Sequence, residues 1–135
     1  MAEISVYTDA GARGNPGPAA IAVLVFEGGK LIKEHGEYIG KATNNQAEYQ
    51  AVIKGLEMAK DMGASDVRLF TDSELVCRQL KGEYKAKDRK LKPLYEKVRE
   101  MEKGFERIEW KSVPRENPFI RRADRIVNRV LDSVG

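Results

Sequence analysis

The chain has 135 residues, of which 41% are hydrophobic and 33% are charged, as expected for one soluble globular domain spanning residues 1–135. It has no apolar stretch near the roughly 18 residues of a membrane span and no apolar signal-peptide core, so we predict a cytoplasmic protein without a membrane partner. The single Cys77 excludes an internal disulfide and a cysteine-based zinc site. The net charge of +3 is small, but the segment 81–92 carries six bases and two acids, which is compatible with a polyanionic substrate.

The first half of the chain is typical of an antiparallel meander followed by a helix. The three strands are expected at residues 3–9, 19–26 and 31–39. Thr43, with Gln46 three residues later, forms a capping-box pattern that starts a helix, and Gly63 ends it.

The second half alternates strands with helices. The expected elements are a strand at 67–71, a short helix at 73–80, a longer helix at 91–101, a strand at 107–113 and a last helix that starts near Pro118 or Phe119. This βββαβααβα order predicts an α/β fold with one five-stranded mixed sheet flanked by helices.

Two aspartates occupy matching positions in this pattern. Asp9 and Asp72 each follow a threonine at the predicted carboxyl end of a strand. Because the carboxyl ends of parallel strands lie at one edge of a sheet, where α/β proteins bind ligands, we expect the two side chains to be close together. Either aspartate alone would be explained as a turn former or a helix N-cap. Their paired occurrence, with glycines after the first, favours a site.

Two further acids lie in the first turns of predicted helices. Glu48 shares a helix face with Val52 and Leu56, so its carboxylate should point toward the core, where it must be paired or bind a cation. Asp124 borders the apolar stripe of the last helix beside Val127. The alternative for both is an acid favoured near the N-terminus of a helix by the helix dipole.

Four motifs together resemble the type 1 ribonuclease H family, in the family's order and over nearly the whole chain. They are Thr8-Asp9-Ala10-Gly11, Thr43-Asn44-Asn45 with Ala47-Glu48, Thr71-Asp72-Ser73 and Ala123-Asp124. The resemblance implies a ribonuclease H-like fold and a metal-dependent endonuclease. It would hydrolyse the RNA strand of RNA–DNA hybrids to 5′-phosphate and 3′-hydroxyl ends. The catalytic and metal-binding acids would be Asp9, Glu48, Asp72 and Asp124, with two magnesium ions as cofactor and manganese as a possible replacement.

The same resemblance implies a substrate-binding set. Its members are Gly11, Asn15, Lys41, Thr43, Asn44, Asn45 and Glu74. The chain departs from many members in lacking a long basic protrusion, because only a short basic loop separates Leu80 from Leu91. It also has no histidine before the last aspartate. Arg115 occupies that loop, as in archaeal-like members, and we expect it to assist catalysis.

Two other functions stay open at this point. One is a related nuclease that also cleaves double-stranded RNA, and the other is a non-catalytic module that binds hybrids. The presence of all four acids argues against the second. We expect a monomer whose partner is the RNA–DNA hybrid.

Overall fold

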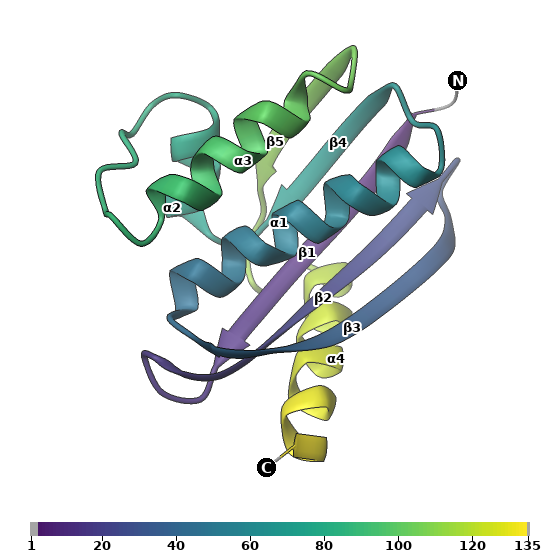
Figure 1. Ribbon diagram of the computed structural model, residues 1–135. Helices are drawn as coiled ribbons and strands as arrows, with labels where there is room; N and C mark the ends of the chain where they lie inside the picture. The colour runs from purple at the N-terminus through teal and green to yellow at the C-terminus, as the bar shows by residue number, and fades with distance from the viewer. Residues whose placement is uncertain (1–2, 135) are drawn as a thin grey trace.

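The computed structural model describes residues 3–134 and contains one sheet with helices on both faces (Figure 1). The elements in chain order are β1 (Ile4–Ala12), β2 (Gly17–Glu27), β3 (Lys30–Ala42), α1 (Asn44–Asp61), β4 (Asp66–Thr71), α2 (Glu74–Leu80), α3 (Lys92–Glu102), β5 (Arg107–Ser112) and α4 (Pro118–Val134). The predicted order of elements and the five-stranded mixed sheet are confirmed.

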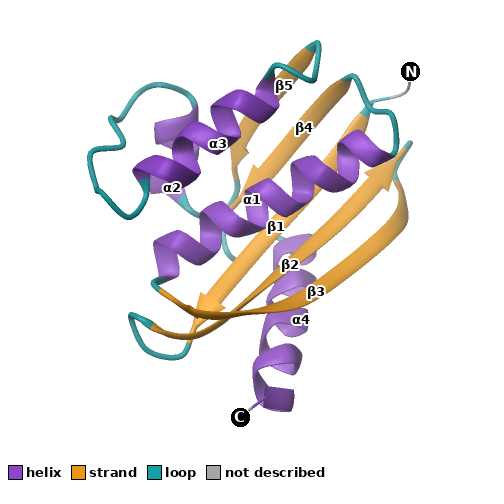
Figure 2. Cartoon of the chain, in the orientation of Figure 1, coloured by secondary structure: helices purple, strands orange, loops and turns teal. Residues whose placement is uncertain are grey.

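The sheet has the strand order β3-β2-β1-β4-β5. The first three strands form the predicted antiparallel meander, while β4 and β5 run parallel to β1. Figure 2 shows α1 and α3 on one face of the sheet and α4 on the other. Because both faces are covered, β2 is apolar along almost its whole length: Val23 and Val25 pack toward α1, whereas Leu24 and Phe26 pack toward α4.

The expected end of the first strand at Asp9 was wrong. β1 continues for three more residues because its antiparallel partner β2 also continues, to the pair Ala12 and Ala19. The parallel pairing with β4 stops earlier, at Tyr7 and Phe70. Asp9 therefore lies two residues beyond Tyr7, the last residue of β1 that pairs with β4, and no residue of β4 pairs with it.

Helix α1 begins as the capping box predicts. The Gln46 N–H donates to Thr43 Oγ1 at 3.1 Å, and the Thr43 N–H donates to Gln46 Oε1 at 2.8 Å. Further along, Gly55 lets the helix approach the sheet closely, since a Cβ there would lie 2.9 Å from Cγ1 of Val6. This close approach brings the first turns of α1 beside β1.

The last helix is fixed at its start by a residue outside the predicted site. The Oδ1 of Asn117 accepts hydrogen bonds from the N–H groups of Phe119 at 2.9 Å and Ile120 at 3.2 Å, and so caps α4. The Phe119 ring packs edge-on against Tyr7, with ring centroids 5.0 Å apart. Among the helices within residues 3–134, none is long and apolar enough to cross a membrane.

Candidate active site

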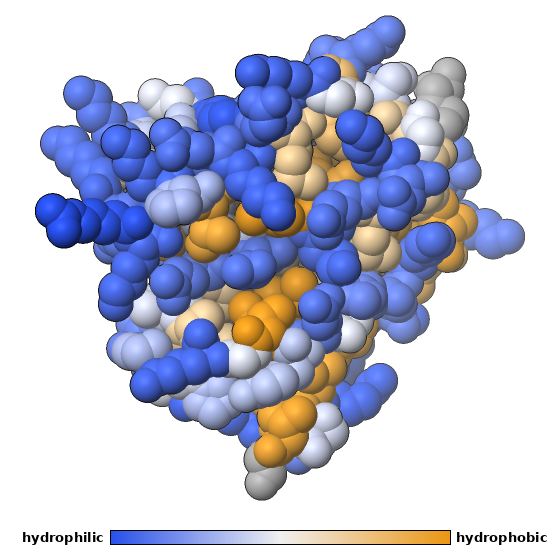
Figure 3. Space-filling view, in the orientation of Figure 1, coloured by the Kyte–Doolittle hydropathy of each residue, from blue (hydrophilic) through white to orange (hydrophobic). Residues whose placement is uncertain are grey.

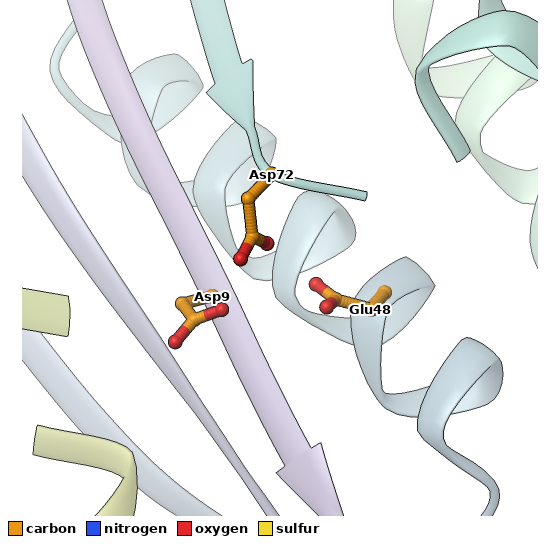
Figure 4. Close-up of side chains that lie close together, drawn as sticks. All are labelled: Asp9, Glu48 and Asp72. Atoms are coloured by element: carbon orange, nitrogen blue, oxygen red, sulfur yellow. The ribbon is translucent and has the colours of Figure 1, made fainter. Parts of the chain in front are cut away.

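Three acids from different elements meet at one end of the sheet. Asp9 comes from β1, Glu48 from α1, and Asp72 from the residue after β4. One carboxylate oxygen from each lies within 4.8 Å of the others, and Figure 4 shows the three side chains approaching one another. The predicted meeting of Asp9 and Asp72 is therefore confirmed in the fold, and Glu48 points toward them.

Glu48 is buried, with a relative exposure of 6%, and its Oε1 has no hydrogen-bond partner within the described residues. A buried carboxylate oxygen without a partner is costly in free energy unless a cation satisfies it. Oxygen ligands of this kind suit a hard divalent cation such as magnesium. The residues present therefore fit a divalent metal ion.

The pKa values of the three acids reflect the same crowding. Burial, followed by repulsion from Asp72 and Asp124, raises the pKa of Asp9 to about 8. Burial, followed by repulsion from Asp9 and Asp72, raises the pKa of Glu48 well above its ordinary value. Burial also raises the pKa of Asp72, although the charge of Arg115 opposes the shift. The raised pKa of Asp9 favours its protonated form near neutral pH, whereas a bound cation would favour the ionised carboxylate.

Asp124 and Arg115 line the same pocket of about 190 Å³ as the three acids. Asp124 is exposed and stands outside the close group of three, with its Oδ2 accepting a 3.3 Å hydrogen bond from Asn128 Nδ2. The Arg115 Nε lies 3.7 Å from Asp72 Oδ2. All four predicted acids therefore reach one pocket, but three of them are much closer together.

The expected substrate residues divide among several surfaces. Gly11 and Asn44 line the pocket of the acids. A neighbouring cavity of about 470 Å³ is lined by Asn15, Thr43, Asn45, Asp88, Arg89, Lys90 and Leu91. The Oδ1 of Asn15 accepts a 2.9 Å hydrogen bond from the Asn44 N–H, which joins the β1–β2 turn to the start of α1.

Two expected residues lie outside both of these pockets. Lys41 lines a third pocket together with Gln46 and Lys90. Glu74 is exposed at the start of α2 and forms an ion pair with Arg78 at 3.2 Å.

Conversely, the sequence did not identify residues 88–91 as part of the cavity beside Thr43. The positive charge of the segment marks it as a candidate, but only the fold shows where it lies. Figure 3 shows the largely hydrophilic face of the molecule that α1, α3 and this segment form.

Known proteins are similar to this chain along almost its whole length. A family model described as "Reverse transcriptase-like" matches residues 7–130. A ribonuclease HI of Halobacterium salinarum is 44% identical over 130 residues, which cover 96% of this chain and 64% of that protein. The crystal structure of RNase H1 from the same archaeon superposes with a TM-score of 0.91 and 41% identity, covering 97% of this chain and 98% of that one.

A third similar protein was solved with nucleic acid. The crystal structure of LC11-RNase H1, from a compost metagenome, in complex with an RNA/DNA hybrid has a TM-score of 0.90 and 39% identity, covering 97% of this chain and 98% of that one. The chain spans less than two thirds of the length of the curated relatives that it matches, 64% for the Halobacterium protein and 36% for a bifunctional protein of Mycobacterium tuberculosis.

Proposed function

The chain belongs to the type 1 ribonuclease H family, and we propose on that premise that it is a metal-dependent endonuclease of RNA–DNA hybrids. It would hydrolyse the RNA strand and leave 5′-phosphate and 3′-hydroxyl ends. The observation that carries the proposal is the buried, unpaired Oε1 of Glu48 facing two more carboxylates within 4.8 Å. A structural role for these acids does not explain why three carboxylates converge, because the ion pair of Arg115 with Asp72 leaves Glu48 Oε1 without a partner among the described residues.

The acids Asp9, Glu48, Asp72 and Asp124 would hold magnesium, two ions in the catalytic complex, with manganese as a substitute. When bound, divalent ions would supply activation of the attacking water and stabilisation of the charge on the leaving 3′-oxygen. The protein supplies the rigid placement of the acids: β1 and the end of β4 fix the two aspartates, and α1 fixes Glu48. Asp124, being exposed, would complete the site from α4.

Arg115 has a different role in this proposal, because a guanidinium remains protonated and cannot act as a base. It would assist water activation or product release from its position beside Asp72. Its exposed side chain leaves it free to contact a phosphate at the entrance of the pocket.

We propose that the substrate lies across the acid pocket and the cavity lined by Thr43 and Asn45. Gly11, Asn15 and Asn44 would contact the RNA strand and the strand junction, and Thr43 with Lys41 would bind a DNA phosphate. Glu74 would contact a 2′-hydroxyl from the start of α2. Such a surface reads A-form-like shape and 2′-hydroxyl groups, not base sequence.

Residues 1–135 would form one monomeric, cytoplasmic ribonuclease H domain. Double-stranded RNA is a second candidate substrate, because it shares the A-form geometry and the 2′-hydroxyl groups. The test is a side-by-side assay of labelled hybrid, double-stranded RNA and double-stranded DNA, each with magnesium and with chelator. Magnesium-dependent cleavage of the hybrid is expected, and hybrid left intact would contradict the proposal.

A further inference from the structure

The loop of residues 81–91, which we call the basic loop, is exposed at most positions, yet it has a defined path between α2 and α3. Backbone hydrogen bonds hold its two ends, from Gly82 N to Gln79 O at 3.0 Å and from Leu91 N to Asp88 O at 3.1 Å. Between them, the carbonyl of Lys85 receives a long hydrogen bond of 3.5 Å from the Nε2 of Gln79. A buried side chain of α2 therefore reaches the middle of the loop.

Gln79 itself is held from α1. It is 4% exposed, and its Oε1 accepts a 2.5 Å hydrogen bond from the hydroxyl of Tyr49, which is 0% exposed. Burial raises the pKa of Tyr49 above its ordinary value, so the hydroxyl stays protonated and donates. Because this donor occupies the amide oxygen, the amide nitrogen of Gln79 is directed to Lys85.

Arg99 fixes the end of α2 from which the loop departs. Its Nη2 donates to the carbonyl of Gln79 at 3.1 Å and to that of Leu80 at 2.6 Å, while its Nη1 pairs with Glu102 at 2.8 Å. The last carbonyls of a helix lack partners within the helix, so this guanidinium satisfies groups that would otherwise be unpaired. Three helices thus converge on the start of the basic loop.

The hydrogen bond between Tyr49 and Gln79 is not required to fill the core. Tyr49 belongs to the main apolar cluster, where an apolar pair would fill the same space without polar groups to satisfy. Tyr49 also follows Glu48 directly in α1. The same turn of the helix therefore presents one carboxylate to the acid cluster and supports the loop that contributes Arg89 and Lys90 to the neighbouring cavity.

We propose that Gln79, oriented by Tyr49, is a positioning residue for the basic loop. It holds the loop where Arg89 and Lys90 line the cavity beside Thr43, and it thereby sets the affinity for the hybrid without taking part in the chemical step. The effect on hybrid affinity rests on the proposed function. The placement of the basic loop by Gln79 is a property of the protein without substrate.

The test compares wild type with the double variant Tyr49→Phe/Gln79→Leu. Replacing both partners by apolar groups leaves no unpaired polar atom between them, so the fold should be kept. Amide hydrogen exchange without substrate should become faster in residues 82–91 and stay unchanged in β1 and β4. With hybrid, KM should rise about two- to tenfold, the value of one hydrogen bond, while kcat stays near wild type.

A matched control is Leu24→Ala, which removes core volume on the opposite face of the sheet, against α4. It should lower the melting temperature without a selective change in the loop or in KM. If the double variant does not fold, Tyr49→Phe alone is measured in the same way. Unchanged exchange in the loop, or a fall in kcat at constant KM, would overturn the positioning role. The hydrogen-exchange result tests the positioning role of Gln79 even if the wild-type protein cleaves no hybrid. Absence of cleavage by wild type would contradict only the proposed function.

Discussion

The Nε of Arg115 lies 3.7 Å from Oδ2 of Asp72, so a side chain that is 88% exposed contacts an acid that is only 10% exposed. Its charge also lowers the pKa values of Asp9 and Glu48, against the larger effect of burial. The loop before α4 therefore delivers a permanent positive charge to the edge of the acid cluster.

Replacing this residue, Arg115→Ala, should reduce turnover at saturating substrate by roughly tenfold. The loss should be smaller than that of a fully desolvated donor, because the side chain is exposed. Magnesium binding measured by calorimetry should remain. Arg121→Ala, on an exposed arginine of α4, serves as the control and should keep wild-type turnover. Equal turnover in both variants would remove Arg115 from the reaction.

The raised pKa of Asp9 predicts a pH-dependent stability for the metal-free protein. The unfolded chain loses this proton near pH 3.8, whereas the folded protein keeps it until about pH 8. The folded state therefore binds more protons between these values, and stability falls as the pH rises through the window. In chelator, Asp9→Asn should melt on the order of 10 to 20 °C higher than wild type near pH 8.5, with no difference near pH 4. A difference that does not depend on pH would contradict this assignment.

The basic loop should govern the salt dependence of hybrid binding. Neutralising Lys85, Lys87, Arg89 and Lys90 should flatten the slope of log affinity against log salt by nearly one unit for each phosphate that the loop no longer neutralises. The control removes the same charge from exposed positions elsewhere, namely Lys30, Lys33, Lys60 and Lys103. An equal change of slope in both variants would mean that net charge, and not the loop, is responsible.

Asp124 and Asp132 lie on the same helix but should behave differently. Asp124 lines the pocket of the acids, whereas Asp132 pairs with Arg13 at 2.7 Å near the other end of α4. Asp124→Asn should strongly reduce magnesium-dependent cleavage, with residual activity in manganese. Asp132→Asn loses only an exposed ion pair and should stay within a few-fold of wild type. The reverse order of the two activities would show that the wrong acid of α4 has been assigned to the site.

The sequence predicted those features that depend on local chemistry. Thr43 and Gln46 were sufficient for the start of α1, and the spacing of Glu48 from Val52 and Leu56 indicated that its carboxylate faces inward. A Thr-Asp pair at each of two predicted strand ends indicated that Asp9 and Asp72 would meet, because the two strands run parallel, although β1 itself continues to Ala12.

Other features depend on partners that are distant in the sequence. The extension of β1 beyond Asp9 is set by the length of β2, and no signal at Asp9 indicates it. The position of residues 88–91 beside Thr43 depends on the path of the basic loop. The hydrogen bonds of Gln79 with Tyr49 and of Arg99 with Leu80 connect the start of this loop to residues distant in the sequence. Likewise, no local signal in the sequence indicates that Asp132 pairs with Arg13, because this contact depends on the position of α4.

The most direct test of the acid cluster is the cleavage of a labelled RNA–DNA hybrid by Asp72→Asn in magnesium. The variant should fold like wild type by circular dichroism, since an amide occupies the same volume. It should nevertheless lose about a thousandfold or more of the activity, because an amide cannot bind the metal as a carboxylate does. Wild type should cleave with magnesium and stop with chelator. Turnover near that of wild type by folded Asp72→Asn would contradict the claim that these acids form the metal site.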